Sequence, residues 1–251
     1  MSQNRPARLF GIIMCFCVAI LASGQNSGVN SNSRGRTSAE ELTALGIDLS
    51  EPSLLGALSN TNPRIRVLAA YQLESSHYVD STVAIEHALS VEQNPPTRVG
   101  LATALAGLHD PQGIEHLQKM CADTTVPINA LIAAAQMLEI LNSSVAGCTD
   151  TFLSSLTNDR DKDYRSATLT LLPALYREST PEQTGLIVKV IQKLLRDRTQ
   201  EPAVRMAAGD ALTEIGVASS ASVIGEAVSE EADPVVLASL KRNLNALAKR
   251  L

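Results

Sequence analysis

The residues with the clearest capacity for chemistry are two Glu-His pairs in matching local sequences. Glu86-His87 and Glu115-His116 each follow an isoleucine. Imidazole nitrogens and carboxylate oxygens are metal ligands, so two stacked pairs could contribute to a metal or enzyme-like site. Such a site needs three or four converging ligands, however, and a repeated solvated helix face would give the same pattern. Metal binding is therefore the alternative hypothesis, and a possible partner-binding face is the leading one.

No motif of an established catalytic class accompanies these pairs. The sequence lacks G-x-S-x-G, a phosphate-binding glycine loop, H-E-x-x-H and C-x-x-C. Cys121 and Cys148 lie near predicted helix ends, where a buried structural thiol is the common state of cysteine. We therefore predict a non-enzymatic protein without a cofactor.

A basic stripe is the second candidate surface for partner binding. Lys189, Lys193 and Arg196 are spaced i, i+4, i+7, which places them on one face of a helix. Lys119 lies beside the second Glu-His pair. Charged runs are usually solvated faces, and the alternative is a groove that steers a charged protein segment.

The helices that must position these side chains repeat along the chain. Six segments share one slot, which holds Arg in four copies and Leu in two, and successive slots are 32 to 40 residues apart. The six positions are Arg66, Arg98, Leu131, Arg165, Arg205 and Leu237. A period near this value indicates a helical array.

Each copy has the features of a helix–turn–helix. Asn62-Pro63, Asn94-Pro95 and Asp233-Pro234 each place a capping side chain before a proline at the first helical position. The apolar residues of 204–215 then recur at helical spacing. A second apolar stretch follows in each copy, and the longest step predicts a second helix over roughly 181–196. Stacking of these units predicts an all-α solenoid of about five to six repeats, including terminal half-repeats.

The order Asp/Asn-Pro, hydrophobe, Arg, Ala pair and Ala-Leu resembles the HEAT repeat family in its short, phycobilisome-lyase-like form. The resemblance is clearest in the segment EPAVRMAAGDAL (201–212). The resemblance as a whole extends over about 38–251. It implies an α-solenoid that serves as an interaction surface, without a particular activity. One HEAT-array enzyme, deoxyhypusine hydroxylase, holds iron with His-Glu pairs. Here the order is reversed, the pairs lie on the other helix of each repeat, and there are two.

The recurring arginines are predicted to be structural. Arg66, Arg98, Arg165 and Arg205 keep one place in four copies beside the apolar stripe. We expect each guanidinium to reach a loop carbonyl or carboxylate between repeats.

The N-terminus predicts export. Arg5 and Arg8 precede 14 uncharged, mostly apolar residues (9–22), and Ala22-Ser23-Gly24 is a small-x-small cleavage site. The run is short for a membrane span of about 20 residues, although an uncleaved anchor stays open. We therefore predict a signal peptide (1–24), a flexible linker (25–37) rich in Asn, Ser, Gly and Arg, and a solenoid (38–251) whose first helix is capped by Ser38 and Glu41. The protein would be periplasmic or secreted.

Charge narrows the class of partner. The chain has a net charge of −5, and without residues 1–24, which contain two Arg and no acid, 19 basic residues face 26 acidic ones, a net of −7. An acidic chain disfavours nucleic acid. The leading prediction is a cell-envelope scaffold that binds an unidentified protein or peptide on the face lined by the second helices, without a membrane span after signal removal.

Two cysteines remain after the leader. An oxidising compartment permits Cys121 and Cys148 to pair. The repeat register, however, places them about 12–13 Å apart if both follow regular stacked helices. This exceeds the limit of about 7 Å between Cα atoms, so we predict that they are not bonded to each other.

Overall fold

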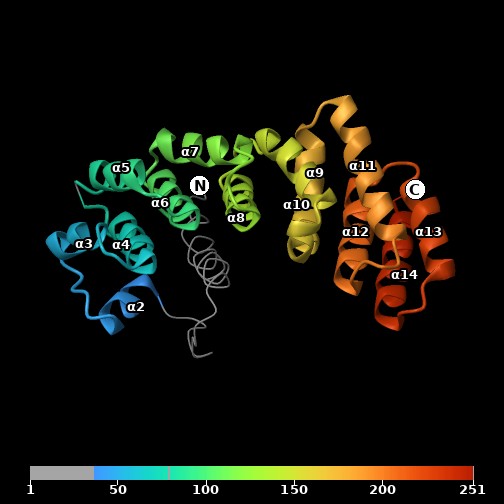
Figure 1. Cartoon of the computed structure of the whole chain (residues 1–251), viewed down its shortest axis with the longest axis horizontal. Helices are drawn as coiled ribbons and strands as arrows, with labels where there is room; N and C mark the ends of the chain where they lie inside the picture. Colours follow the sequence, from blue (N-terminus) through green and yellow to red (C-terminus); the bar gives the residue numbers. More distant parts are fainter. Residues whose placement is uncertain (1–36, 79, 251) are drawn as a thin grey trace, which may run out of the picture. The chain divides into compact units, whose positions relative to one another are not determined.

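The computed structural model describes residues 37–78 and 80–250, and the predicted signal peptide and residues 25–36 of the linker lie outside this range. Thirteen α-helices and two 3₁₀ turns, with no strand, occur in the described residues (Figure 1). This confirms the all-α solenoid prediction. The described residues form two compact units, one ending at Met120 and the other beginning at Cys121. In the described range, no helix combines the length and apolarity needed to cross a bilayer.

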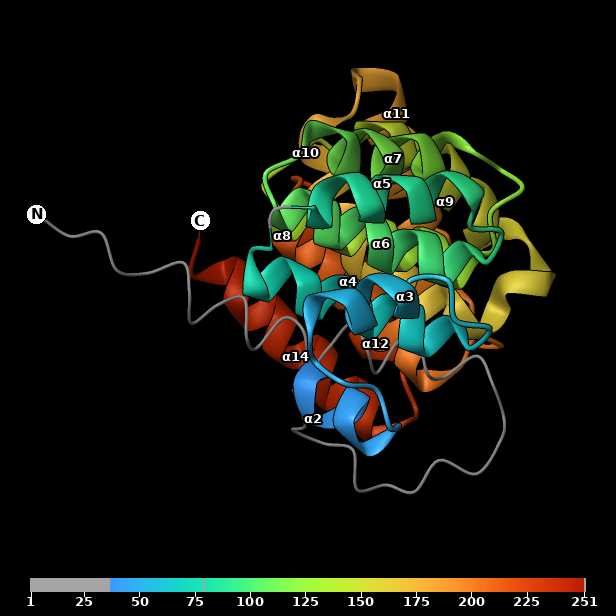
Figure 2. The ribbon, with the colours of Figure 1, turned by 90° about the vertical axis from the view of Figure 1, so that its left-hand side faces the viewer.

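The first unit is a series of helical hairpins. Its helices are α2 (Ser38–Ala44), α3 (Glu51–Ala57), α4 (Pro63–Ser76), α5 (Ser81–Val91), α6 (Pro95–Gly107) and α7 (Pro111–Ala122), the last two residues of which belong to the second unit. Figures 1 and 2 show the second helices α5 and α7 on one side of this unit, with α4 and α6 beneath them.

The second unit continues the same alternation. Its elements are α8 (Ile128–Ile140), η1 (Ala146–Cys148), α9 (Thr149–Thr157), η2 (Asp159–Tyr164), α10 (Arg165–Glu178), α11 (Pro181–Arg196), α12 (Pro202–Ile215), α13 (Ser220–Glu230) and α14 (Pro234–Ala248). The predicted long second helix is α11, and its bounds match the expectation.

The predicted caps begin the helices. The side chains of Asn62, Asn94 and Asp233 accept hydrogen bonds from the first backbone N–H groups of α4, α6 and α14, and a proline follows each. These caps satisfy N–H groups that have no partner within a helix. The capping box of α2 lies one residue earlier than predicted, because Thr37 and Glu40 form it.

Neighbouring helices pack closely through glycine residues. Gly100 on α6 lies under Val67 of α4, and an added Cβ would come within 2.7 Å of a Val67 methyl carbon. Gly209 on α12 faces Leu240 of α14 in the same way, at 2.5 Å. Gly113 on α7 is tighter still, since a Cβ there would lie 2.4 Å from the α6 backbone. Such contacts let neighbouring helices approach at the lower end of the usual spacing.

Three of the four recurring arginines, Arg66, Arg165 and Arg205, contact a loop or side chain of the repeat junction. Arg66 pairs with Glu92 at 2.6 Å and donates to the carbonyl of Asn60 at 2.7 Å. Arg205 pairs with Glu231 at 3.0 Å and donates to the carbonyl of Gln200. We call these two arrangements the Arg–Glu clamps.

The fourth copy uses a neutral partner. Arg165 donates to the side-chain oxygen of Gln200 at 3.0 Å and to the carbonyl of Asn158 at 3.4 Å. It therefore also reaches the loop between repeats, which is the structural role predicted from the sequence. Within the described residues of the first unit, Arg98 makes neither an ion pair nor a side-chain hydrogen bond, so the prediction does not hold for it there.

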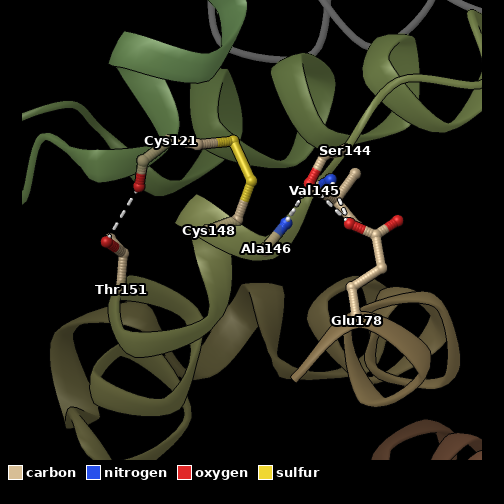
Figure 3. Close-up of a disulfide and its surroundings, with 7 residues drawn as sticks. All are labelled: Cys121, Ser144, Val145, Ala146, Cys148, Thr151 and Glu178. Atoms are coloured by element: carbon tan, nitrogen blue, oxygen red, sulfur yellow. Dashed lines mark hydrogen bonds between the residues drawn. A yellow bond between two sulfur atoms is a disulfide. The ribbon is translucent and has the colours of Figure 1, made fainter. Parts of the chain in front are cut away.

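The prediction that Cys121 and Cys148 are unpaired is wrong. The two form a disulfide with a Cα–Cα distance of 4.4 Å, and both side chains are buried (Figure 3). The predicted offset assumed that Cys148 follows a regular helix. Instead it ends the 3₁₀ turn η1, after Asn142 has reversed the chain with a φ of +52°.

Hydrogen bonds hold this turn in place. The Glu178 carboxylate at the end of α10 accepts from the Ser144 hydroxyl at 2.7 Å and from the Val145 N–H at 2.9 Å (Figure 3). On the other side, the Thr151 hydroxyl donates to the Cys121 carbonyl at 3.0 Å. The turn therefore folds back onto the end of α7 and removes the axial offset that the register implied.

Candidate functional site

An open cleft of about 490 Å³ lies in the first unit between α3 and α5. Its apolar lining comes from Leu55, Leu58, Ala84, Ala88 and Val91. Its polar lining comes from Ser59, Asn60, Thr61, Arg66, His87, Glu92 and Gln93. The cleft thus combines an apolar wall on the second helix with a polar wall at the repeat junction.

Helix periodicity on α5 creates the apolar wall. Ile85 and Leu89 are fully buried in the core. Ala84, Ala88 and Val91 follow on the adjacent helix face and line the cleft, and Val91 is 60% exposed. An exposed valine in a concave surface is available for contact with another molecule.

The polar wall contains the first Arg–Glu clamp, formed by Arg66 and Glu92. Burial alone would raise the pKa of Glu92, but hydrogen bonds from Arg66 and the Asn94 N–H, together with the Arg66 charge, hold it below its usual value. The carboxylate is therefore ionised at neutral pH, and its charge is balanced by Arg66. Arg66 also donates to the Asn60 carbonyl. Because the opposite charges of Arg66 and Glu92 offset each other, this pair adds little net charge to the cleft.

The structure separates the first Glu-His pair. His87 lines the cleft and is exposed. Glu86 is outside the lining and accepts a hydrogen bond from Gln112 of α7 at 2.7 Å. Burial and the neighbouring Asp110 carboxyl raise the pKa of Glu86. Only the histidine of this pair can therefore meet a ligand in the cleft.

The second pair lies outside the cleft lining. Glu115 forms an exposed ion pair with Lys119 at 2.7 Å, and this bond lowers the pKa of the carboxyl. His116 is half-buried, and its Nδ1 has no hydrogen-bond partner. Burial lowers the pKa of His116, and the Arg98 and Lys119 charges lower it further.

The two Glu-His pairs do not form a metal centre in the described part of the chain. No group of three or more His, Cys, Asp or Glu side chains there is arranged to hold a metal ion. The Glu-His repetition instead reflects equivalent places on α5 and α7 with different surroundings.

The basic stripe lies in the second unit. Lys189, Lys193 and Arg196 are exposed on α11, as their spacing predicts. Arg196 pairs with Glu226 of α13 at 2.8 Å, and the Arg196 bond lowers the pKa of that carboxyl. Exposed pairs of this kind contribute little to stability.

Sequence reasoning missed the apolar wall and the acidic partners. Leu55 and Val91 belong to separate helices, so no local pattern joins them. Glu92 and Glu231 did leave a signal: each follows its arginine by 26 residues and precedes the next helix-starting proline by three.

Comparison with known proteins agrees with this geometry. The family model described as HEAT repeats matches residues 149–245. This part of the chain therefore consists of HEAT repeats. The comparison with curated proteins found no match.

Two solved structures are similar to the chain. Human deoxyhypusine hydroxylase, in complex with glycerol, is 15% identical, with 97% of this chain and 100% of that chain covered and a TM-score of 0.35. The complex of CpcE and CpcF of phycocyanin lyase from Nostoc sp. PCC7120 is 15% identical, with 88% of this chain and 100% of that chain covered and a TM-score of 0.36. Neither similarity assigns an activity to the chain.

Proposed function

We propose that this HEAT-repeat protein is a non-enzymatic scaffold of the cell envelope that binds a segment of another protein in the cleft between α3 and α5. The observation that carries the proposal is the exposed apolar wall facing a charge-balanced polar wall. Val91 is 60% exposed there, whereas the neighbouring Ala88 is buried.

The composition of the cleft favours an apolar segment as ligand. Its volume of about 490 Å³ suits a few side chains. Arg66 and Glu92 already satisfy each other, so a charged ligand would have to disrupt a buried pair. Leu55 and Val91 offer apolar contact, and the exposed imidazole of His87 offers a polar one.

Two features support export. The N-terminal leader has the charge, length and cleavage site of a signal peptide. The Cys121–Cys148 disulfide is a bond that persists in oxidising compartments such as the periplasm. We propose a periplasmic or secreted location on these grounds.

Val91→Glu is expected to weaken peptide binding. A displayed library of random peptides, selected on the purified protein, should yield apolar sequences that bind it. A carboxylate at Val91 would meet the apolar wall and the Glu92 charge, so affinity measured by fluorescence anisotropy should fall at least tenfold.

Val235→Glu is the matched control, because Val235 is 63% exposed on α14 and belongs to the second unit. It should leave the affinity unchanged. Equal losses in both variants, or a library that yields no binder, would contradict the assignment to the cleft.

Export is expected to remove residues 1–24. The mature protein should begin near Gln25, since Ala22-Ser23-Gly24 is the cleavage site. Intact-mass measurement of the protein from the cell envelope or medium checks this. A mature form that still carries Met1 would show an anchor instead.

A further inference from the structure

The outer face of α5 continues the apolar wall of the cleft. Val91 lines the cleft and is 60% exposed, and Val83 on the same helix is 70% exposed. His87 lies between them at the i, i+4, i+8 spacing that places three side chains on one helix face. Val83 and Val91 are eight residues apart, which is about 12 Å along the helix. An apolar segment that enters the cleft at Val91 can therefore extend along α5 as far as Val83.

Two carboxyl groups lie at the Val83 end of this face. Glu86 is three residues from Val83, so the two side chains are neighbours on α5. Gln112 of α7 joins Glu86 to Asp110, because its side-chain amide donates to Glu86 at 2.7 Å and its backbone N–H donates to Asp110 at 2.8 Å. Figures 1 and 2 show α5 and α7 side by side. We call Glu86 and Asp110 the junction carboxyls, since they meet where these two helices adjoin.

The junction carboxyls have no cationic partner in the part of the chain that the structure describes. None of the ion pairs there includes Glu86 or Asp110. Lys119 of α7 pairs with Glu115 instead, at 2.7 Å. Both junction carboxyls are partly exposed, so a ligand can reach them. Because two neighbouring carboxylates repel each other, a cation bound between them would relieve the repulsion.

We propose that the protein segment bound in the cleft carries a lysine or arginine that pairs with the junction carboxyls while its apolar residues contact Val83 and Val91. This inference rests on the proposed function and adds a charge to the chemistry of the ligand. The basic group stays outside the cleft, so the buried pair of Arg66 and Glu92 remains intact. Complementary charge of this kind steers association and fixes the direction in which the segment lies.

Peptides selected from a random library on the purified protein test the charge. Those that bind in the cleft, as shown by weaker binding to Val91→Glu, are expected to carry at least one lysine or arginine. Replacing that residue with glutamine should lower the affinity about fivefold, the upper range for an exposed ion pair, when fluorescence anisotropy is measured at low salt. The basic peptide and its glutamine form should bind equally at about 1 M salt, because charges are screened there.

Glu86→Gln tests the carboxyl group while it keeps a side-chain oxygen that can accept from Gln112. This variant should bind the basic peptide about fivefold more weakly and bind the glutamine form with unchanged affinity. Glu182→Gln is the matched control, since it removes the same charge from an exposed position in the first turn of α11, in the second unit. The control should leave both affinities unchanged.

Failure of this inference is distinguishable from failure of the proposed function. A library without binders would contradict both. Cleft binders that lack basic residues, or whose affinity Glu86→Gln leaves unchanged, would contradict this inference alone. Calcium that displaces the basic peptide more strongly than sodium at equal ionic strength would make the junction carboxyls a metal site. Self-association that Glu86→Gln abolishes would make a second copy of the chain the occupant. Either of these last two results would also overturn the assignment to a basic segment of another protein.

Discussion

Reduction of the Cys121–Cys148 disulfide is expected to lower the free energy of unfolding by about 3–4 kcal/mol. The two residues are 27 apart in the sequence, and a cross-link over a loop of this length restricts the unfolded chain. The bond is also fully buried, so its loss leaves two thiols within a packed turn. Urea unfolding of the purified protein, with and without reductant, measures the difference.

The double variant Cys121→Ala, Cys148→Ala is the control for this experiment. Its unfolding midpoint should not respond to reductant. In the wild-type protein, thiol labelling should find Cys121 and Cys148 unreactive when the oxidised chain is unfolded, and reactive after reduction. A wild-type midpoint that reductant leaves in place would contradict the stabilising role.

Arg205→Ala is expected to lower the free energy of unfolding by about 3–5 kcal/mol, the range for breaking a buried ion pair from one side. The Arg205 and Glu231 side chains are 8% and 4% exposed. Burial alone would raise the pKa of Glu231, but hydrogen bonds from the Asp233 N–H and Arg205, with the Arg205 and Arg198 charges, hold it low. Truncation of Arg205 therefore leaves a buried charge with fewer partners. Chemical unfolding monitored by circular dichroism measures the loss.

Arg98→Ala provides the matched comparison, because it truncates the same repeat position where the residue 26 positions later is Thr124 rather than Glu. Its effect should be about 1 kcal/mol or less, as for most substitutions without a broken network. Similar losses in both variants would show that the arginines stabilise their repeats through packing rather than through Glu231 and its equivalents.

Helix positions were largely predictable because their determinants are local. Asn62-Pro63 and Asp233-Pro234 combine a capping side chain with a fixed φ, and both begin helices as predicted. The interval between Arg165 and Arg205 likewise indicated the length of α11. The start of α2 differed by one residue because Thr37 and Ser38 are both capable caps, and only the three-dimensional structure selects Thr37.

The disulfide was not predictable from the register. A helical offset applies only to residues that continue the helix, whereas Cys148 follows a chain reversal at Asn142. Glu178 holds this reversal from a helix that begins only after Cys148 in the sequence. A contact of that kind is set by tertiary structure, and no spacing rule within 121–148 contains it.

The candidate site was predictable in part. The repeated arginines pointed to the repeat junction, and Arg66 does line the cleft. His87 also lines it, although its neighbour Glu86 binds Gln112 instead. The apolar wall could not be predicted, because Leu55 and Val91 come together only when α3 and α5 pack around α4. The second Glu-His pair has different surroundings from the first, since Glu115 pairs with Lys119 and His116 is half-buried.

The position of the disulfide simplifies the maturation of the protein. Four cysteines are present when the chain is synthesised, and four cysteines can pair completely in three ways. Cys15 and Cys17 lie in the predicted leader, whereas Cys121 and Cys148 form the bond. If the leader is removed before oxidation, one pairing remains. The processed chain then needs an oxidant to mature, and it has no wrong intramolecular isomer for a disulfide isomerase to correct.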